Sequence, residues 1–374
     1  MKTIYAITTI SGTIIGAGLF ALPYITLQVG FWVILAYFLI LGSLVVLIHL
    51  FFGELSLKTP DFKRLPGFAK VYLGKNGEIV AYTSTILGLF GAILVYLILG
   101  GKFLTELVSP QAGTLPFTLF YFVVGAALIF YGIKAIEKVE FWGLVLFLVI
   151  LFAVFFKGAA FINIENLFIG QCSMSNGQWS NLFLPYGAIL FSLWGAALIP
   201  EAEEILGKRK KMLSRIIPIT ILIPVLVYLF FIYIILGITG VQTTEEALSG
   251  EALSGLKDIL GNGMIILALL FGLLTTFTSF VALGLTLKKV LWYDLKISKN
   301  LAWAITCFSP LILYLIGIKS FIAVIGVVGG IMLAIDGILI LLMYKKIKPQ
   351  RAYLVYPLIF VLLGGIIYSV IYYS

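Results

Sequence analysis

The first apolar stretch of this chain contains a glycine-rich run that ends in a proline, where a membrane-spanning helix would have to be continuous. Residues 12–23 read GTIIGAGLFALP. Glycine inside a helix costs about 1 kcal/mol relative to alanine and an interior proline about 3 kcal/mol, so we expect the helix to break here. Within hydrocarbon, the freed backbone groups must be satisfied by the protein or by what lines a cavity. The run therefore predicts a site near the bilayer midplane where amides meet a carboxylate and carbonyls meet an ammonium group.

The composition is that of a membrane protein. Hydrophobic residues make up 62% of the 374 residues and charged ones 11%, with a mean hydropathy of +1.16. A soluble domain carries roughly 25% charged residues. Eleven apolar runs are long enough to cross a bilayer. They are residues 4–28, 31–57, 77–107, 115–133, 139–157, 181–206, 216–240, 257–290, 299–317, 319–344 and 353–373.

The basic residues alternate with these runs. With the N-terminus inside, 21 of the 25 Lys and Arg residues fall in inner segments, and only Lys102, Lys157, Lys257 and Lys319 fall outside. Cytoplasmic loops of membrane proteins carry such an excess. The distribution predicts a multi-pass protein of the cell membrane with a cytoplasmic N-terminus and an outer C-terminus. The net charge of +9 therefore indicates membrane topology and not a nucleic-acid partner.

A second interrupted run lies five spans after the first. Residues 190–201 read LFSLWGAALIPE, again a cluster of small residues followed by proline, in a span of opposite direction. Paired interruptions in oppositely oriented halves are typical of inverted-repeat transporters. We therefore expect one transporter domain over 1–374, with a first repeat at 1–157, a second at 181–345 and an extra helix at 353–373. The alternative is that the small residues only allow close helix packing.

Several segments carry a resemblance to a known group of proteins. They are GTIIGAGLFALP, then GAILVY at residues 91–96, and TSF at 278–280 followed by Gly284 and Leu285. Together they resemble the amino acid–polyamine–organocation superfamily, which has the LeuT-type fold, and within it the aromatic and hydroxy amino acid permease and amino acid/auxin permease branches. FSLWGAALIPE resembles the broader superfamily. The resemblance implies an all-α membrane protein of about eleven helices, a 5+5 inverted repeat plus one helix, with helices 1 and 6 discontinuous.

The two interruptions form the expected substrate site. Backbone amides of the first interruption, with the Thr13 hydroxyl, are expected to bind a carboxylate, and carbonyls from Ser192 to Gly195 an amine. The resemblance adds Tyr96 as a carboxylate ligand, although a tyrosine satisfied within the bundle is the alternative. Phe191 and Trp194 are candidates for a gate and a pocket wall or for buried packing, and a tryptophan there favours small or medium apolar substrates. The expected set is Thr13, Ile15, Gly16, Ala17, Gly18, Tyr96, Phe191, Ser192, Trp194 and Gly195.

Two kinds of residue are candidates for binding a coupling ion. The resemblance implies that Thr278 and Ser279 hold Na⁺ together with carbonyls of the first interruption, since oxygen ligands suit a hard cation. Hydroxyls in membrane helices also bond their own backbone, which is the alternative. Acids inside membranes are functional candidates by default, so Asp336 or Glu201 could carry a proton. Glu201 has a rival role, in which it joins Glu203 and Glu204 in pairing with the basic run 208–211.

These observations favour a secondary active amino acid transporter that works by alternating access with H⁺ or Na⁺ symport. An amino acid exchanger, or a transporter-like sensor or receptor subunit without net flux, are the alternatives. An ATP-driven pump is disfavoured because no Walker motif is present. An enzyme is disfavoured because one histidine, His49, which we interpret as structural, and scattered acids leave no acid–base pair or metal cluster. The expected partners are an amino acid and the lipid bilayer, with Na⁺ as the only candidate cofactor.

Overall fold

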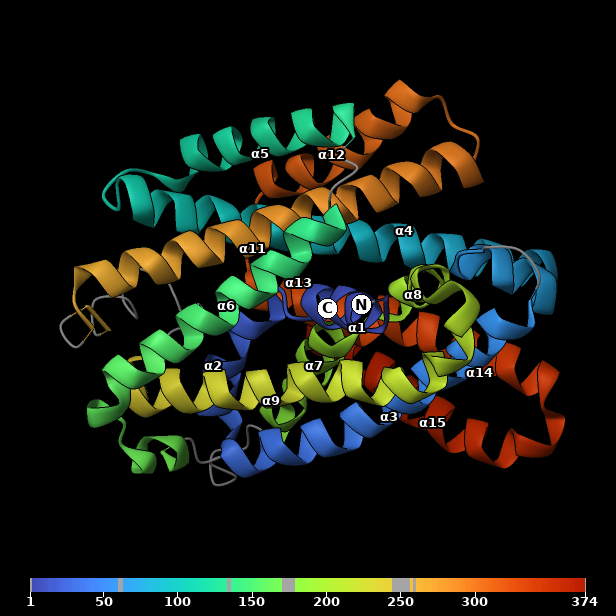
Figure 1. Ribbon diagram of the computed structural model, residues 1–374, viewed down its shortest axis with the longest axis horizontal. Helices are drawn as coiled ribbons and strands as arrows, with labels where there is room; N and C mark the ends of the chain where they lie inside the picture. Colours follow the sequence, from blue (N-terminus) through green and yellow to red (C-terminus); the bar gives the residue numbers. More distant parts are fainter. Residues whose placement is uncertain are drawn as a thin grey trace.

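The computed structural model describes residues 2–59, 63–132, 136–169, 179–243, 256–257 and 260–373. In these ranges the regular structure is helical throughout, and most helices run along the long axis of the molecule (Figure 1). Such a bundle follows from the apolar composition, because a helix satisfies its own backbone hydrogen bonds where water is absent.

The first half of the chain begins with a broken helix. Helices α1 and α2 are separated by a non-helical link and bent by 53° relative to each other. Helix α4 is longer than the expected run because a further helical stretch precedes Gly74, whose φ of +77° kinks the backbone between the two parts. The bounds are α1 (Lys2–Ile14), α2 (Gly18–Val29), α3 (Phe31–Lys58), α4 (Leu65–Val108), α5 (Thr114–Tyr131) and α6 (Ile136–Gly158).

The second half contains the other broken helix. Helix α7 ends before Trp194 and Gly195, and a short 3₁₀ turn, η5, joins them to α8. A π-helical turn, η9, lies between α13 and α14. The bounds are α7 (Pro185–Leu193), η5 (Ala196–Leu198), α8 (Ile199–Leu206), α9 (Leu213–Thr239), α11 (Asn262–Lys289), α12 (Lys299–Leu315), α13 (Phe321–Val327), η9 (Val328–Leu333), α14 (Ala334–Ile347) and α15 (Ala352–Tyr373).

Each of the eleven expected apolar runs has a helical counterpart. By length and composition, eight described segments could cross a membrane, and the bent pair α1–α2 makes a ninth. One of the eight, Asn181–Gln242, contains both the broken span α7–α8 and α9, which are separated at Gly207. Helix α12 is apolar but has only 17 residues. The expected all-helical fold with two discontinuous helices is confirmed.

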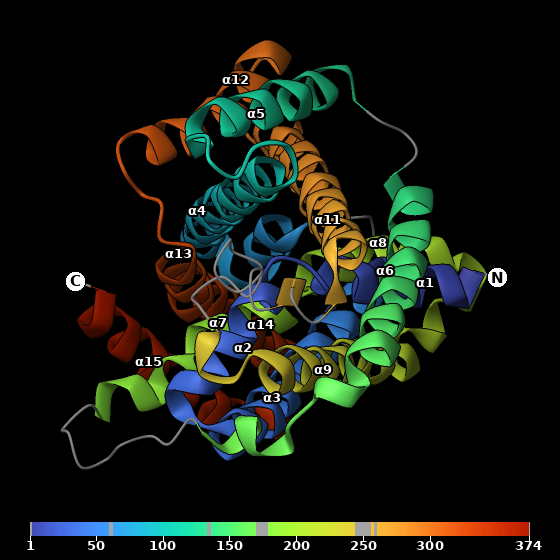
Figure 2. The same ribbon diagram turned by 90° about the vertical axis from the view of Figure 1, so that its left-hand side faces the viewer.

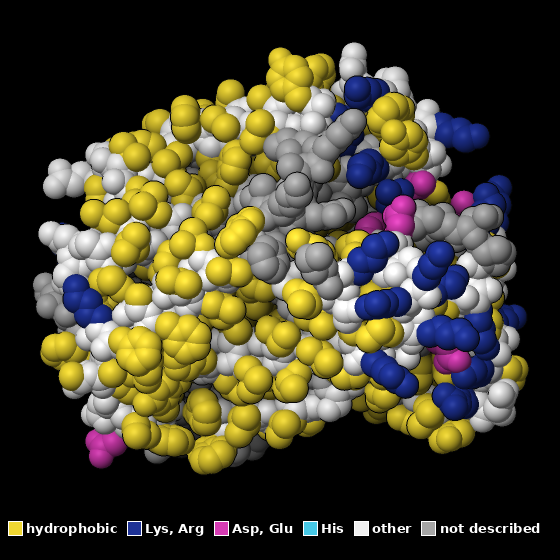
Figure 3. Space-filling model, in the orientation of Figure 1, with side chains coloured by type: hydrophobic (Ala, Val, Ile, Leu, Met, Phe, Trp, Pro, Cys, Tyr) yellow, Lys and Arg dark blue, Asp and Glu magenta, His cyan; other side chains and the backbone are white. Residues whose placement is uncertain are grey.

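The helices form two groups that enclose the breaks. Seen along the long axis, α4, α5, α11 and α12 lie on one side, and α2, α3, α7 and α9 on the other (Figure 2). Helix α1 runs inward from the N-terminus and packs against α6, α8 and α9. Lys and Arg side chains gather at one end of the molecule, around α8 (Figure 3). This is the pattern that the positive-inside reasoning predicts, and the direction of that end in a membrane stays a prediction.

Candidate functional site

The first break leaves helical geometry for only a few residues. The Gly16 amide donates to the carbonyl of Ile14, two residues back, over 2.8 Å, which is a tighter turn than a helix makes. Helix α2 then starts afresh at Gly18. The opening amides of a helix have no partner within it, and they carry partial positive charge. Around this break the amides of Leu19 and Phe20 already donate to the carbonyls of Gly16 and Ala17, so the donors left for an anion are the amides of Ala17 and Gly18. That an anion binds there stays a prediction.

The second break is an extended step in the chain. Trp194 has φ −80° and ψ 115°, in the extended region, and Gly195 has φ −129° and ψ 14°. The Phe191 carbonyl still accepts from the Trp194 amide over 3.4 Å, whereas the last carbonyls of α7 lack the helical amides that would follow. The hydroxyl of Ser192 is not among the free groups, because it donates to the Ala188 carbonyl over 2.7 Å. Its proton is thus taken, and its oxygen can only accept from a ligand, for example from an ammonium group.

The two breaks meet at glycines. A Cβ on Gly18 would collide with the side chain of Ser192, and a Cβ on Gly195 would lie 2.8 Å from the Cδ1 of Ile14. A Cβ on Gly16 would collide with the Tyr96 hydroxyl. The glycines therefore do allow close packing, and this close contact lies at the two breaks, where the helical hydrogen bonding is interrupted. Tyr96 reaches this point from α4 and is buried.

One cavity joins most of the expected site. It has a volume of about 160 Å³ and runs from the two breaks toward Arg64 at the start of α4. Ten of the expected residues line it, namely Thr13, Ala17, Gly18, Tyr96, Phe191, Ser192, Trp194, Gly195, Glu201 and Asp336. Gly16 lies behind the Tyr96 hydroxyl. The folding of the chain thus brings together residues from α1, α2, α4, α7, α8 and α14.

The remaining residues face a second, smaller cavity of about 30 Å³. Ile15, Thr278 and Ser279 line it together with Thr13, which lies between the two cavities. The Thr278 hydroxyl donates to the Thr275 carbonyl over 3.0 Å, so its oxygen keeps a lone pair for another partner. Hydroxyl oxygens of α11 therefore face the first break, as the sodium hypothesis requires. The alternative, in which hydroxyls of a membrane helix bond their own backbone, also applies to Thr278.

The two candidate acids differ in their surroundings. Asp336 is buried, and Ser84 on α4 donates to it over 2.5 Å. One carboxylate oxygen of Glu201, Oε2, is buried and has no hydrogen-bond partner in the described part of the chain. Both acids line the larger cavity. Either could exchange a proton with molecules in that cavity.

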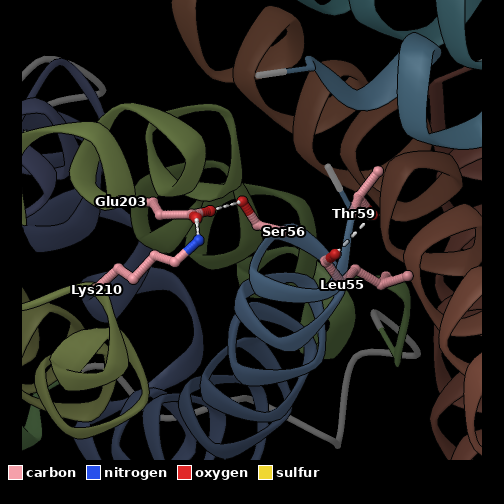
Figure 4. A network of polar contacts seen from close by, with 5 residues as sticks. All are labelled: Leu55, Ser56, Thr59, Glu203 and Lys210. Carbon is pink, nitrogen blue, oxygen red and sulfur yellow. Dashed lines mark hydrogen bonds and ion pairs between the residues drawn. The ribbon is translucent and has the colours of Figure 1, made fainter. Parts of the chain in front are cut away.

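Glu203, and not Glu201, makes the contact with the basic run. Its carboxylate accepts a hydrogen bond from Ser56 on α3 and forms an ion pair with Lys210 at 3.2 Å (Figure 4). Close by, just after the end of α3, the Thr59 hydroxyl donates to the Leu55 carbonyl over 2.8 Å. The acids after the second break thus have separate positions, with Glu201 at the cavity and Glu203 at the end of α3.

Sequence reasoning missed two residues at the breaks. His49, interpreted as structural, accepts a hydrogen bond from the Gly195 amide over 2.9 Å. The Tyr228 hydroxyl lies 2.5 Å from the Ile14 carbonyl oxygen and 2.8 Å from that of Ser192, so it bridges the two breaks. Both side chains are fully enclosed. Tyr228 lies in an ordinary apolar run without a local signal, whereas His49 is marked as the one histidine of the chain, but the sequence does not show its partner.

Trp194 packs to one side of the cavity. Its ring meets the His49 ring edge-on at a centroid distance of 5.3 Å, and a Cβ on Gly337 of α14 would lie 3.2 Å from its far end. The indole therefore lies between α3 and α14, at the cavity wall.

The sequence matches the Tryptophan/tyrosine permease family over residues 1–372. Among curated proteins it is similar to the tyrosine-specific transport system 1 of Haemophilus influenzae, with 27% identity over 348 residues, 88% of this chain and 84% of that protein. It is also similar to the low affinity tryptophan permease of Escherichia coli, with 25% identity over 347 residues, 87% of this chain and 82% of that protein.

The fold is also that of a solved transporter. The crystal structure of MhsT in complex with L-phenylalanine superposes with a TM-score of 0.70, covering 97% of this chain and 98% of that one at 14% sequence identity. The expected LeuT-type fold is confirmed by this match.

Proposed function

We propose that this chain, which belongs to the tryptophan/tyrosine permease family, carries an aromatic amino acid across the membrane by alternating access. The expected substrate is tyrosine or tryptophan. The family consists of multi-pass membrane transporters and not of enzymes. The names of its two curated relatives support this substrate class. The proposal replaces the expectation of a small or medium apolar substrate. That expectation assumed that Trp194 fills the pocket, whereas its ring packs between His49 and Gly337.

The observation that carries the proposal is the meeting of the two breaks on one cavity. The opening amides of α2 would receive the substrate carboxylate, aided by the Tyr96 hydroxyl that lies against Gly16. The carbonyls at the end of α7 would receive the ammonium group. Phe191 would cover the substrate from α7, and Thr13, Ile15 and Ala17 would shape the first break. The side chain would extend into the cavity that the breaks share.

We infer that the transport is driven by an ion, with two sites as candidates. A proton would bind Asp336 or Glu201, which line the substrate cavity. A sodium ion would bind Thr278 and Ser279 across the smaller cavity from Thr13 and Ile15. Direct contact between the acids and the substrate cavity favours the proton, because substrate and proton would then share one access route.

The same proposal includes the repeat division and the orientation. Residues 1–157 would form one repeat and 181–345 the other, each beginning with a broken helix, and α15 would be the extra helix at 353–373. The end rich in Lys and Arg would face the cytoplasm. Purified protein in liposomes, probed from outside with an impermeant reagent at a single cysteine introduced near Lys210, tests the orientation.

The experiment for transport is uptake of radiolabelled L-tyrosine, L-tryptophan and L-leucine into liposomes that hold the purified protein. Proton and sodium gradients are imposed separately. We expect accumulation of the aromatic substrates with an inward proton gradient, and loss of that accumulation in Asp336→Asn or Glu201→Gln. Accumulation with a sodium gradient alone that is lost in Thr278→Ala or Ser279→Ala would instead identify sodium as the coupling ion, bound on α11. Uptake only against preloaded substrate would identify an exchanger, and saturable binding without flux would identify a sensor.

A further inference from the structure

On the cavity wall made by α4 and α14, the polar residues are Tyr96, beside the breaks, and a separate cluster of Ser84, Thr85 and Asp336. We propose that this cluster is a subsite for the polar group on the substrate ring, the phenol O–H of tyrosine or the indole N–H of tryptophan. The proposal rests on the proposed function, and it adds the residues that would tell these substrates from phenylalanine.

The first support is the order of residues along α4. Ser84, Gly88, Ala92 and Tyr96 follow one another at intervals of four in a row that winds slowly around the helix, and all four line the cavity. The stripe is polar at both ends and small in the middle. Ser84 and Tyr96 are roughly 18 Å apart along the axis at a rise of 1.5 Å per residue, and the Tyr96 side chain leans back toward Ser84.

This order matches the polarity of an aromatic amino acid. Its charged end would lie at Tyr96 and the breaks, and its ring beside Gly88 and Ala92, where the helix carries almost no side chain. Leu283 of α11 and Val328 of η9 complete an apolar surround for the ring. The polar atom of the ring would then point along α4 toward the cluster of Ser84, Thr85 and Asp336.

The second support is the unused hydrogen-bonding capacity of the cluster. The Thr85 hydroxyl oxygen is buried and has no partner among the described residues. Ser84 gives its proton to Asp336, whose carboxyl group retains further acceptor capacity. A buried polar atom without a partner is costly, so a ligand that supplies a hydrogen bond there binds better than one that does not.

The third support is the contrast with the other acid of the cavity. Glu201 follows the second break on α8, and its unpartnered oxygen belongs to a different wall from the α4 stripe. The small residues of α4 that leave room for a ring, Gly88 and Ala92, lie between Tyr96 and Ser84 and not between Tyr96 and Glu201. The α4–α14 cluster is therefore the one that a ring held between the breaks and Gly88 would meet.

The test compares substrates in an assay that does not depend on a driving gradient. Exchange of internal and external substrate is measured at equal pH for L-tyrosine, L-tryptophan and L-phenylalanine. We expect wild-type protein to prefer tyrosine and tryptophan over phenylalanine. Thr85→Val, which has nearly the same shape, should raise the KM for tyrosine about tenfold while leaving that for phenylalanine within about twofold. Asp336→Leu should also raise the KM for tyrosine more than that for phenylalanine. Asp336→Asn keeps an acceptor oxygen and should therefore raise the KM for tyrosine by a smaller factor.

A matched control is Thr83→Val. Thr83 is also on α4, but it is exposed and donates to the Ile79 carbonyl, so all three KM values should stay unchanged. Equal preference for tyrosine and phenylalanine in the wild type, or an unchanged preference in both Thr85→Val and Asp336→Leu, would overturn the subsite while the proposed transport stands. A wild-type protein that exchanges no aromatic amino acid would instead overturn the proposed function itself.

Discussion

The Nε2 atom of His49 accepts a hydrogen bond from the backbone amide of Gly195 over 2.9 Å, inside the second break. The Nδ1 atom of the same ring lies 2.8 Å from the Val45 carbonyl oxygen. A carbonyl only accepts, so Nδ1 carries the proton and Nε2 does not. These two bonds fix a neutral imidazole that links α3 to a segment without helical hydrogen bonds.

Replacing this histidine should weaken both the fold and substrate binding. His49→Ala leaves the Gly195 amide buried without an acceptor, at a cost of about 1–3 kcal/mol. We expect a lower midpoint of thermal unfolding in detergent and a raised KM for uptake. His49→Gln offers an acceptor oxygen in a side chain of similar reach and should recover part of both values. If His49→Ala matched wild type in both measurements, the histidine would have no role at the break.

Tyr228→Phe should loosen the link between the two breaks. The tyrosine hydroxyl has one proton to share between the carbonyls of Ile14 and Ser192, and its loss leaves both with fewer donors. We expect the KM to rise about tenfold, since a tenfold change corresponds to about 1.4 kcal/mol. Tyr186→Phe is the control, because that hydroxyl makes only a 3.4 Å contact with the Leu362 carbonyl. Equal KM changes in the two variants would argue against the bridge.

Gly18→Ala should abolish uptake. The added methyl group would occupy the position of the Ser192 side chain, so that one of the two breaks must shift. Gly364→Ala, a change of the same size on α15 where a Cβ meets open space, should transport as wild type does. Initial uptake rates, normalised to the amount of folded protein by size-exclusion chromatography, make the comparison. Normal rates in Gly18→Ala would show that the breaks can separate without loss of function.

The ion pair of Glu203 and Lys210 should matter little for stability. The Lys210 side chain is 52% exposed, and exposed pairs contribute about 0–1 kcal/mol. Lys210→Met is therefore expected to shift unfolding only slightly. Glu203→Leu should have a larger effect, because it also removes the acceptor for the Ser56 hydroxyl. Thermal unfolding of both variants in the same detergent tests this order, and a larger loss for Lys210→Met would reverse it.

Much of the fold could be predicted because its causes are local in the sequence. A bilayer requires long apolar helices, and glycines and prolines weaken a helix wherever they fall. The runs 4–28 and 181–206 thus indicated both breaks before any packing was known, and all eleven runs became helical. The long reach of α4 back to Leu65 was not predicted, since the segment before Gly74 lies outside the apolar run.

The partners of buried polar groups could not be read in the same way. His49 and Gly195 are 146 positions apart, and Ser84 and Asp336 are 252 positions apart. Nothing in an apolar run shows which neighbouring helix a lone histidine or serine will face. Helix propensity and bilayer thickness act on each segment separately, so the elements and their interruptions follow from composition and spacing. Which hydroxyl meets which carbonyl follows from how the helices pack against one another, and this exists only in the folded chain.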